Sequence, residues 1–180
     1  DGSGIHTWLL ESMSLSNLLN ECADMHSRIL FEKVPSSSRW LTILVNAMRD
    51  GKAIQMSYKS FRRTEPTTFE AHPYCLKIFR QRWYMLAHTP GKEELRIYSL
   101  DRIADIEVLD TPLLLPENFD AADFFSDYFG IIIGHNIKPS ILELKASAEQ
   151  ARYLESLPLH STQEVVETTP EYTIFRYRIV

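Results

Sequence analysis

The strongest constraint on the fold is a change in the spacing of apolar residues at Lys52. From there Ile54, Met56 and Tyr58 alternate with polar residues, the period-two pattern of a strand with one buried face. The turns that follow, Arg80-Gln81 among them, divide the next residues into further β-like runs. The expected strands are residues 53–61, 69–79, 82–88, 94–100 and 103–109. Five short strands so close together favour a small closed barrel, because closure leaves no strand edge unpaired.

Helical patterns precede this β region. Apolar residues between Leu15 and Leu30 fall on one helical face, and Ser36-Ser37-Ser38 supplies an N-cap for a second helix that Gly51 ends. The expected apolar face of the second helix comprises Trp40, Leu41, Leu44, Val45 and Met48. Both faces are typical of a core or a dimer surface.

The remaining residues predict a helix over 118–129, closed by Gly130, and then a strand, a helix and two strands at 141–146, 147–156, 163–168 and 172–180. This βαββ order is a partial ferredoxin-like unit that looks cut short, because the full pattern needs one more helix and strand. The class is α+β with a mainly β core. The expected domains are a helical linker or dimerisation segment (1–51), the barrel (52–115), a helical connector (116–139) and the βαββ unit (140–180).

Charge is distributed unevenly along the chain. Residues 52–102 hold ten Lys or Arg and five acids, about +5, so the rest of a chain of net charge −5 carries about −10. A basic island of this kind suits a local anion site, although solvated strand faces would give the same count. Two cysteines are too few for a disulfide framework and suit a reducing cytoplasm, and no apolar run is long enough to span a membrane.

Catalytic motifs for nucleophilic, metal-dependent or phosphate chemistry are missing from the sequence, so we expect no enzyme and no cofactor. His72 and Cys75 are spaced like half of a metal site. A structural zinc needs four ligands and no second half is evident, so we expect no metal.

Basic and aromatic residues are interleaved between Tyr58 and Asp105. Aromatic rings stack on bases, and Arg and Lys neutralise phosphates. Arg96 shares a strand face with Tyr98, whereas Arg102 could alternatively form a salt bridge with the adjacent Asp101.

This stretch resembles the WYL domain, a family named for a Trp-Tyr-Leu triplet that is Trp83-Tyr84-Met85 here. The resemblance covers about residues 44–109 and includes Tyr58, Pro73 and the ending Arg96…Leu100-Asp101-Arg102-Ile103. Residues 141–180 resemble the start of the C-terminal extension of such proteins. Met85 in place of Leu conserves volume, and we expect Trp83 to pack inside.

The resemblance implies a Sm-like, SH3-type barrel in a bacterial transcription regulator with an N-terminal DNA-binding helix-turn-helix. It implies a single-stranded nucleic-acid or nucleotide effector, bound through basic and aromatic residues. The candidate ligand-binding residues are Tyr58, His72, Lys77, Arg82, Tyr84, Arg96 and Arg102. No helix-turn-helix pattern precedes the barrel, so the chain is expected to sense the effector as a homodimer and to reach promoter DNA only through the missing domain.

Two other interpretations remain open. In the first, the chain is a dimerisation and coupling module without a ligand, and Arg96 and Arg102 are paired with acids inside the fold. In the second, it is a constitutive single-stranded RNA-binding module, which would bind without changing its oligomeric state.

Overall fold

The computed structural model describes residues 38–134 and 137–180. The helix predicted between Leu15 and Leu30, and the serine N-cap of the second helix, lie outside the side chains that it describes. A search of the described helices found none that is long and apolar enough to cross a membrane.

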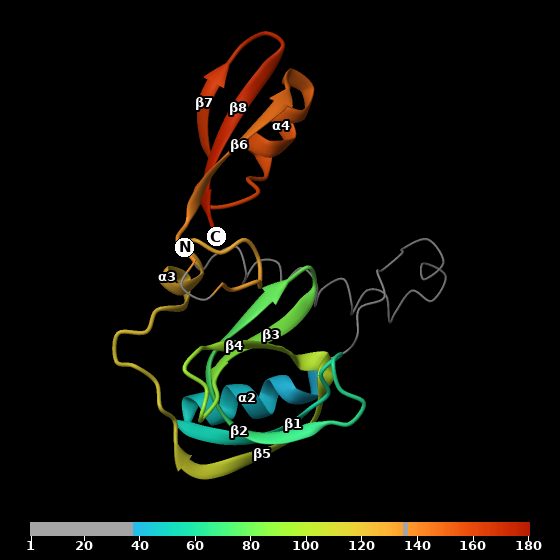
Figure 1. Ribbon diagram of the computed structural model, residues 1–180, viewed down its shortest axis with the longest axis vertical. Coiled ribbons are helices and arrows are strands. Elements are labelled where there is room, and N and C mark those ends of the chain that lie inside the picture. The colour runs from blue at the N-terminus through green and yellow to red at the C-terminus, as the bar shows by residue number, and fades with distance from the viewer. Residues whose placement is uncertain (1–37, 135–136) are drawn as a thin grey trace, which may run out of the picture. The chain divides into compact units, whose positions relative to one another are not determined.

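One helix and five strands form the first part of the described chain (Figure 1). These elements are α2 (Ser38–Arg49), β1 (Lys52–Tyr58), β2 (Thr67–Phe79), β3 (Arg82–His88), β4 (Arg96–Ser99), the 3-10 turn η2 (Leu100–Arg102) and β5 (Ile103–Pro112). All neighbouring strands are antiparallel, in the order β4-β3-β2-β1-β5. The five predicted strands are therefore confirmed, with ends that move by a few residues.

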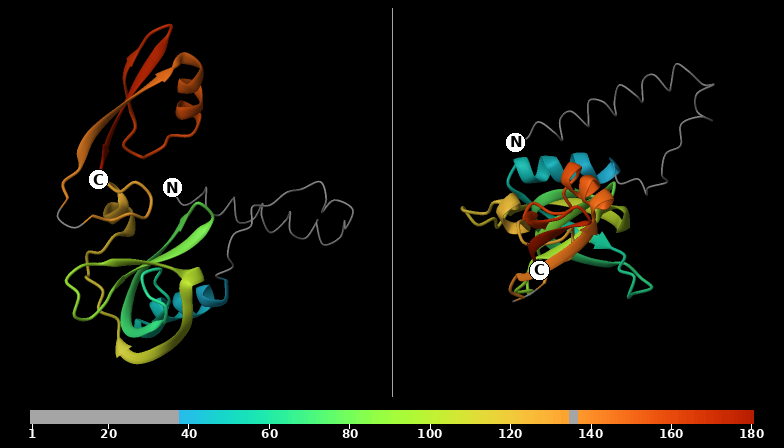
Figure 2. Two further views of the ribbon diagram at one scale, coloured as in Figure 1. Left: turned by 45° about the vertical axis from the view of Figure 1, so that its right-hand side comes forward. Right: turned by 90° about the horizontal axis from the view of Figure 1, so that it is seen from above.

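The long strand β2 joins the two halves of this sheet. Its first part, Thr67–Ala71, pairs with β1, and its second part, His72–Phe79, pairs with β3. Among the described strands no ladder joins β4 to β5, so the hydrogen bonding does not show the closed barrel that the sequence suggested. What is established is a mainly β, five-stranded antiparallel sheet with α2 packed against it (Figure 2).

The core lies between α2 and this sheet. Leu44 is fully buried against Ile54 and Met56, and the indole Nε1 of Trp40 donates to the carbonyl of Ile103 at 3.2 Å. Val45 was predicted to lie on the apolar face of this helix, and that prediction is wrong, since its side chain is 52% exposed.

The buried face of α2 consists of Trp40, Leu44 and Ala47, which recur at spacings of four and three residues. Position 45 is rotated by about 100° from Leu44 and so turns towards solvent.

The triplet strand β3 faces the core as predicted. Met85 is fully buried and Trp83 packs against the same cluster, whereas Arg82 and Tyr84 lie on the opposite face of the strand.

The tight turn between β2 and β3 is also confirmed. Arg80 and Gln81 both have positive φ angles, 47° and 62°, and Phe79 pairs directly with Arg82. Positive φ at both central positions is the geometry of a type I′ hairpin turn.

Residues 113–133, which we call the connector, contain only a short helix, α3 (Ala121–Phe125), capped by the carboxylate of Asp120. The prediction of a helix from 118 to 129 is therefore wrong. Phe119 packs on Tyr74 of β2, with ring centres 5.1 Å apart, and the backbone at Gly130 lies against the ring of Phe79. Through these contacts the connector packs along β2 and does not form a continuous helix.

The last part is β6 (Ser140–Ser147), α4 (Ala148–Ser156), β7 (Glu164–Thr168) and β8 (Tyr172–Ile179). Strand β8 lies between β6 and β7 and is antiparallel to both, so the predicted βαββ order is confirmed. Phe175 and Tyr177 of β8 form the core of this sheet with Ala151 of α4. The predicted domain boundaries remain predictions.

Candidate anion-binding site

Tyr58 ends β1 and forms part of the core more than of the surface. It is only 8% exposed, its hydroxyl accepts a hydrogen bond from the backbone N–H of Ser99 at 3.2 Å, and its ring meets that of Tyr98 edge-on. Burial raises the pKa of Tyr58, so the phenol stays neutral. Tyr58 can therefore hold neighbouring residues of a binding site in place, but its own side chain offers little surface to a ligand.

Arg102, at the end of η2, stacks on aromatic rings. Its guanidinium carbon lies 3.8 Å from the centre of the Phe61 ring and 5.0 Å from that of Tyr58, and its Nε donates to the carbonyl of Lys59 at 3.0 Å. In the described part of the chain no carboxylate lies within ion-pairing distance of Arg102, and the salt bridge considered with Asp101 is not found. The guanidinium is held in place by rings and a backbone carbonyl, and no carboxylate of the described residues pairs with its charge.

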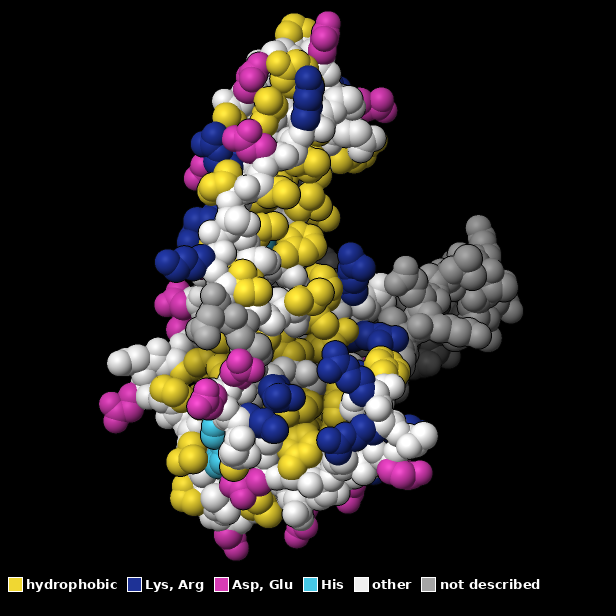
Figure 3. All heavy atoms as spheres, in the orientation of Figure 1, with side chains coloured by type: hydrophobic (Ala, Val, Ile, Leu, Met, Phe, Trp, Pro, Cys, Tyr) yellow, Lys and Arg dark blue, Asp and Glu magenta, His cyan; other side chains and the backbone are white. Residues whose placement is uncertain are grey.

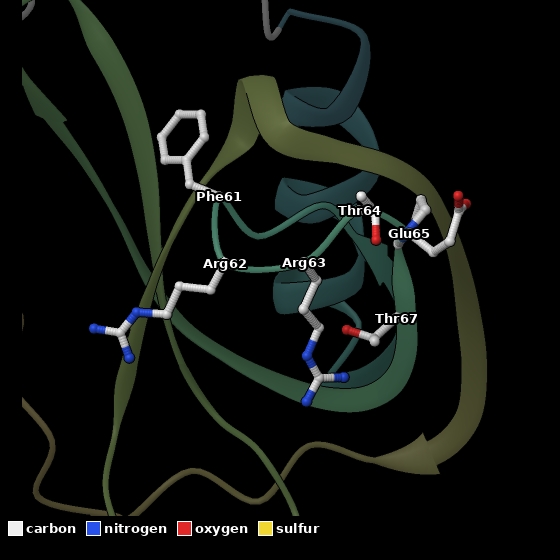
Figure 4. Close-up of a pocket in the computed structure, with 7 residues that line it drawn as sticks. Phe61, Arg62, Arg63, Thr64, Glu65 and Thr67 are labelled. Carbon is white, nitrogen blue, oxygen red and sulfur yellow. The ribbon is translucent and has the colours of Figure 1, made fainter.

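Two more arginines follow Phe61 in the loop after β1, and their side chains extend to the side of the loop opposite the Phe61 ring (Figure 4). Residues 61–67 line an open hollow of about 590 Å³. Figure 4 shows Arg62 and Arg63 extending to the same side of the loop, while the carboxylate of Glu65 points away from both. No ion pair involves either arginine among the described residues. The ring of Phe61 is 87% exposed.

We call Phe61, Arg62, Arg63 and Arg102 the cationic rim. Figure 3 shows Lys and Arg side chains gathered around exposed apolar atoms on the five-stranded part of the molecule. Guanidinium groups form bidentate bonds with phosphates, and an exposed ring stacks on a base. Only Arg102 of the rim was among the predicted site residues. The sequence pattern that could have identified the other three is an aromatic residue followed by two arginines in a turn after a strand.

Lys77, Arg82 and Tyr84 are brought together on the face of β2 and β3 that points away from the core. Lys77 pairs directly with Tyr84, so these two side chains share that face. However, the ammonium of Lys77 lies 3.8 Å from the centre of the Phe125 ring in the connector, and burial lowers the pKa of Lys77. Arg82 has Nη1 at 3.8 Å from the carboxylate of Asp101, a loose ion pair.

His72 lies beneath the connector and is only 1% exposed. Its Nδ1 accepts a hydrogen bond from the backbone N–H of Leu114 at 3.1 Å, and its Nε2 is 3.2 Å from a carboxylate oxygen of Glu70. Burial lowers the pKa of His72, while Glu70 opposes that shift. His72 therefore fixes the connector and is not accessible to a ligand as the chain stands.

We call His72, Lys77 and Phe79 the covered face, because the connector contacts all three.

Arg96 is separated from Tyr84, another of the candidate ligand-binding residues. It is exposed on β4 and shares a face with Tyr98, as predicted. Tyr84 pairs directly with Ser99, which alternates with Tyr98 along β4, so Tyr84 and Arg96 lie on opposite faces of the sheet. The seven predicted residues therefore lie in different parts of the sheet and do not form one cluster.

A five-stranded antiparallel sheet with a packed helix and a cationic, aromatic rim defines a small α+β domain built around its β core. Residues 39–108 match the family model of the WYL domain, so this segment of the chain is similar to WYL domains. A similar solved structure is proteasome accessory factor B/C (PafBC) of Arthrobacter aurescens, with a TM-score of 0.43, 16% sequence identity and coverage of 82% of this chain. The chain spans 22% of the length of that protein.

Proposed function

We propose that this chain is the non-catalytic sensor part of a cytoplasmic transcription regulator, and that its cationic rim binds a single-stranded nucleic acid or a nucleotide. The WYL domain supports the regulatory role. The observation that supports this ligand is the guanidinium of Arg102, which lies 3.8 Å from the centre of the exposed Phe61 ring and has no carboxylate partner among the described residues. We further propose that the curled sheet is a Sm-like, SH3-type unit and that the βαββ unit is ferredoxin-like.

The rim offers the two contacts that a single strand requires. Its three guanidinium groups neutralise phosphates, and stacking on an aromatic ring contributes about 1–3 kcal/mol per base. Because Arg102 is already oriented by Phe61 and Lys59, a ligand orders few additional side-chain bonds when it binds. Unlike the ligand-free coupling module, this arrangement leaves the charge of Arg102 open to solvent.

A signal from the rim has a short path to α2. Arg102 precedes Ile103, whose carbonyl accepts the hydrogen bond from the indole of Trp40 in α2. Occupation of the rim therefore acts on a turn bonded to the helix at the start of the described chain. We propose that the effector alters how two subunits pair, and so alters DNA binding by a helix-turn-helix domain. A ligand shifts such an equilibrium only by the difference between its affinities for the two states.

The test is fluorescence anisotropy with a labelled single-stranded DNA of about ten nucleotides, titrated at several salt concentrations. Binding should weaken as salt rises, because the strand releases counterions. Arg102→Ala should weaken binding by at least about tenfold, or 1.4 kcal/mol, whereas Lys77→Ala should leave it within about twofold. An affinity that does not depend on salt, or that Arg102→Ala leaves unchanged, contradicts the proposal.

The oligomeric state distinguishes the other two interpretations. Sedimentation velocity with and without the oligonucleotide should show a change in subunit association if the chain is a sensor. Association without any binding would favour the coupling module. Binding that leaves association unchanged would favour a constitutive RNA-binding module.

A further inference from the structure

A second hollow lies at the end of the β2–β3 hairpin, between the hairpin and the connector. Its volume is about 400 Å³, within the range of small-molecule sites. It is lined by Phe79, Arg80, Arg82, Tyr84, Phe129, Ile131 and Ile132. We propose that this hollow binds a small carboxylate with an aliphatic or aromatic tail, a ligand distinct from the nucleic acid proposed for the cationic rim.

The walls of the hollow favour an apolar tail. Phe129 and Ile132 of the connector are exposed, Ile132 by 79%, although both are large apolar side chains. Covering apolar surface is favourable by about 25 cal/mol for each Å² removed from water. A ligand that fills the space between these side chains and Phe79 gains this contribution, and a polyphosphate would not.

The charged residues in the lining of the hollow favour an anionic head group. Two of the lining residues are arginines and none is acidic. Arg80 is exposed and forms no ion pair within the described chain, while Arg82 reaches Asp101 only at 3.8 Å. Two guanidinium groups beside apolar walls suit one compact carboxylate, which accepts paired hydrogen bonds from arginine.

The turn that carries Arg80 provides an independent argument. Arg80 and Gln81 both have left-handed φ angles, where Asn-Gly is the usual choice. A side chain with a Cβ costs about 1–2 kcal/mol at such a position. Backbone strain of this kind is concentrated at functional sites, and here it holds Arg80 in the lining of the hollow.

Gly130 holds the opposite wall in place. Its φ angle is +81°, and a Cβ atom there would lie 2.6 Å from Cζ of Phe79. The connector backbone can therefore approach the hairpin only because residue 130 has no side chain. This contact brings the apolar residues that follow Gly130 to the hollow.

The experiment uses the fluorescent sulfonate 1-anilinonaphthalene-8-sulfonate as a probe of the full chain. Its fluorescence should rise with one site per chain, and octanoate should displace it. Octanamide, which has the same tail without the charge, should displace it at least about tenfold more weakly. The substitutions Arg80→Gln and Arg82→Gln, combined, should weaken octanoate binding at least about tenfold, whereas Lys92→Gln in the next turn should have no effect.

A second variant separates binding from folding. Arg80→Asn with Gln81→Gly should raise the melting temperature, because it relieves the turn, and should weaken octanoate binding. Equal displacement by octanoate and octanamide, or unchanged octanoate binding in this variant, would overturn the proposal. Displacement of the probe by the single-stranded oligonucleotide would also overturn it, because the hollow would then belong to the effector site.

Discussion

The cationic rim and the covered face contain the same kinds of side chain but differ in what surrounds them. In the rim, Arg102 lies over Phe61, and no described carboxylate pairs with it. On the covered face, His72 is bonded to the backbone of Leu114, and Lys77 lies on a ring of the connector. The rim thus holds charges that are oriented and still open to a ligand.

This difference shows that a basic residue of this sheet cannot be assigned to ligand binding by its type alone. The connector covers Lys77, whose ammonium packs against an aromatic ring and is not left open to a ligand. The predictions below test that division, beginning with the largest expected effect.

Replacing both rim arginines of the loop, Arg62→Ala with Arg63→Ala, should weaken binding of the single-stranded oligonucleotide by at least about 100-fold, because each charge-assisted bond contributes about 1.5–3 kcal/mol. The slope of log affinity against log salt should fall by about 0.7 for each phosphate contact that is lost. Anisotropy titrations between low and moderate salt measure both quantities.

The matched control is Lys92→Ala with Lys138→Ala, which removes the same charge from two exposed positions outside the rim. If this control lowers the slope as much as the loop variant does, net charge and not the rim accounts for binding.

The connector contact should be sensitive to Gly130→Ala. Alanine is strained at a φ of +81° and its Cβ would press on the Phe79 ring, so we expect a loss of about 2 kcal/mol in the stability of the connector. Hydrogen exchange should become faster at the amide of Leu114 and along residues 113–133. Oligonucleotide affinity should stay within about twofold, and a larger loss would mean that the rim depends on the connector.

The sequence predicted most of the regular structure because the information is local. The alternation of apolar and polar residues located strands β1 to β3. The pattern of residues 147–156 likewise predicted helix α4. The sequence could not show whether the outer strands of the sheet pair with each other, because edge pairing depends on how a sheet curls. It also failed in the connector, where contacts with Tyr74 and Phe79 overrode a helical pattern.

The candidate site was harder to predict because it depends on register between strands. Arg96 and Tyr84 were both predicted to belong to one site, yet the register places them on opposite faces of the sheet, since Tyr84 pairs with Ser99 and not with Tyr98. Arg102 was among the predicted site residues, and its role in binding stays a prediction. The contact between its guanidinium and Phe61 joins a turn and a loop distant in the chain, and no local pattern encodes it.

The burial of His72 makes the covered face sensitive to pH. Burial lowers the pKa of His72 below its ordinary value of 6.5, so the unfolded chain binds this proton more readily than the folded chain. The contribution of neutral His72 to the free energy of unfolding is therefore complete above pH 6.5. It is lost as the pH falls from 6.5 towards the lowered pKa. The slope of unfolding free energy from this group is at most about 1.4 kcal/mol per pH unit.

The variant His72→Gln should remove this dependence, because an amide oxygen can accept from the N–H of Leu114 without titrating. Chemical denaturation at pH 5, 6, 7 and 8 measures the difference between the two proteins. Glu70 and His88 also lie close to the ring, so the same series in Glu70→Gln separates their contribution. Parallel curves for the original chain and His72→Gln would show that this histidine is not the titrating group.

The smallest effect is expected for Lys77→Met. A partly buried cation over a ring contributes about 0.5–1 kcal/mol, and a methionine sulfur gains a similar contact with the Phe125 ring. The free energy of unfolding should therefore change by less than about 0.5 kcal/mol. Oligonucleotide affinity and its salt slope should be unchanged, because the ammonium is engaged by the connector. A tenfold loss of affinity in a variant this conservative in shape would mean that the effector displaces the connector, and the covered face would then have to be counted as part of the binding site.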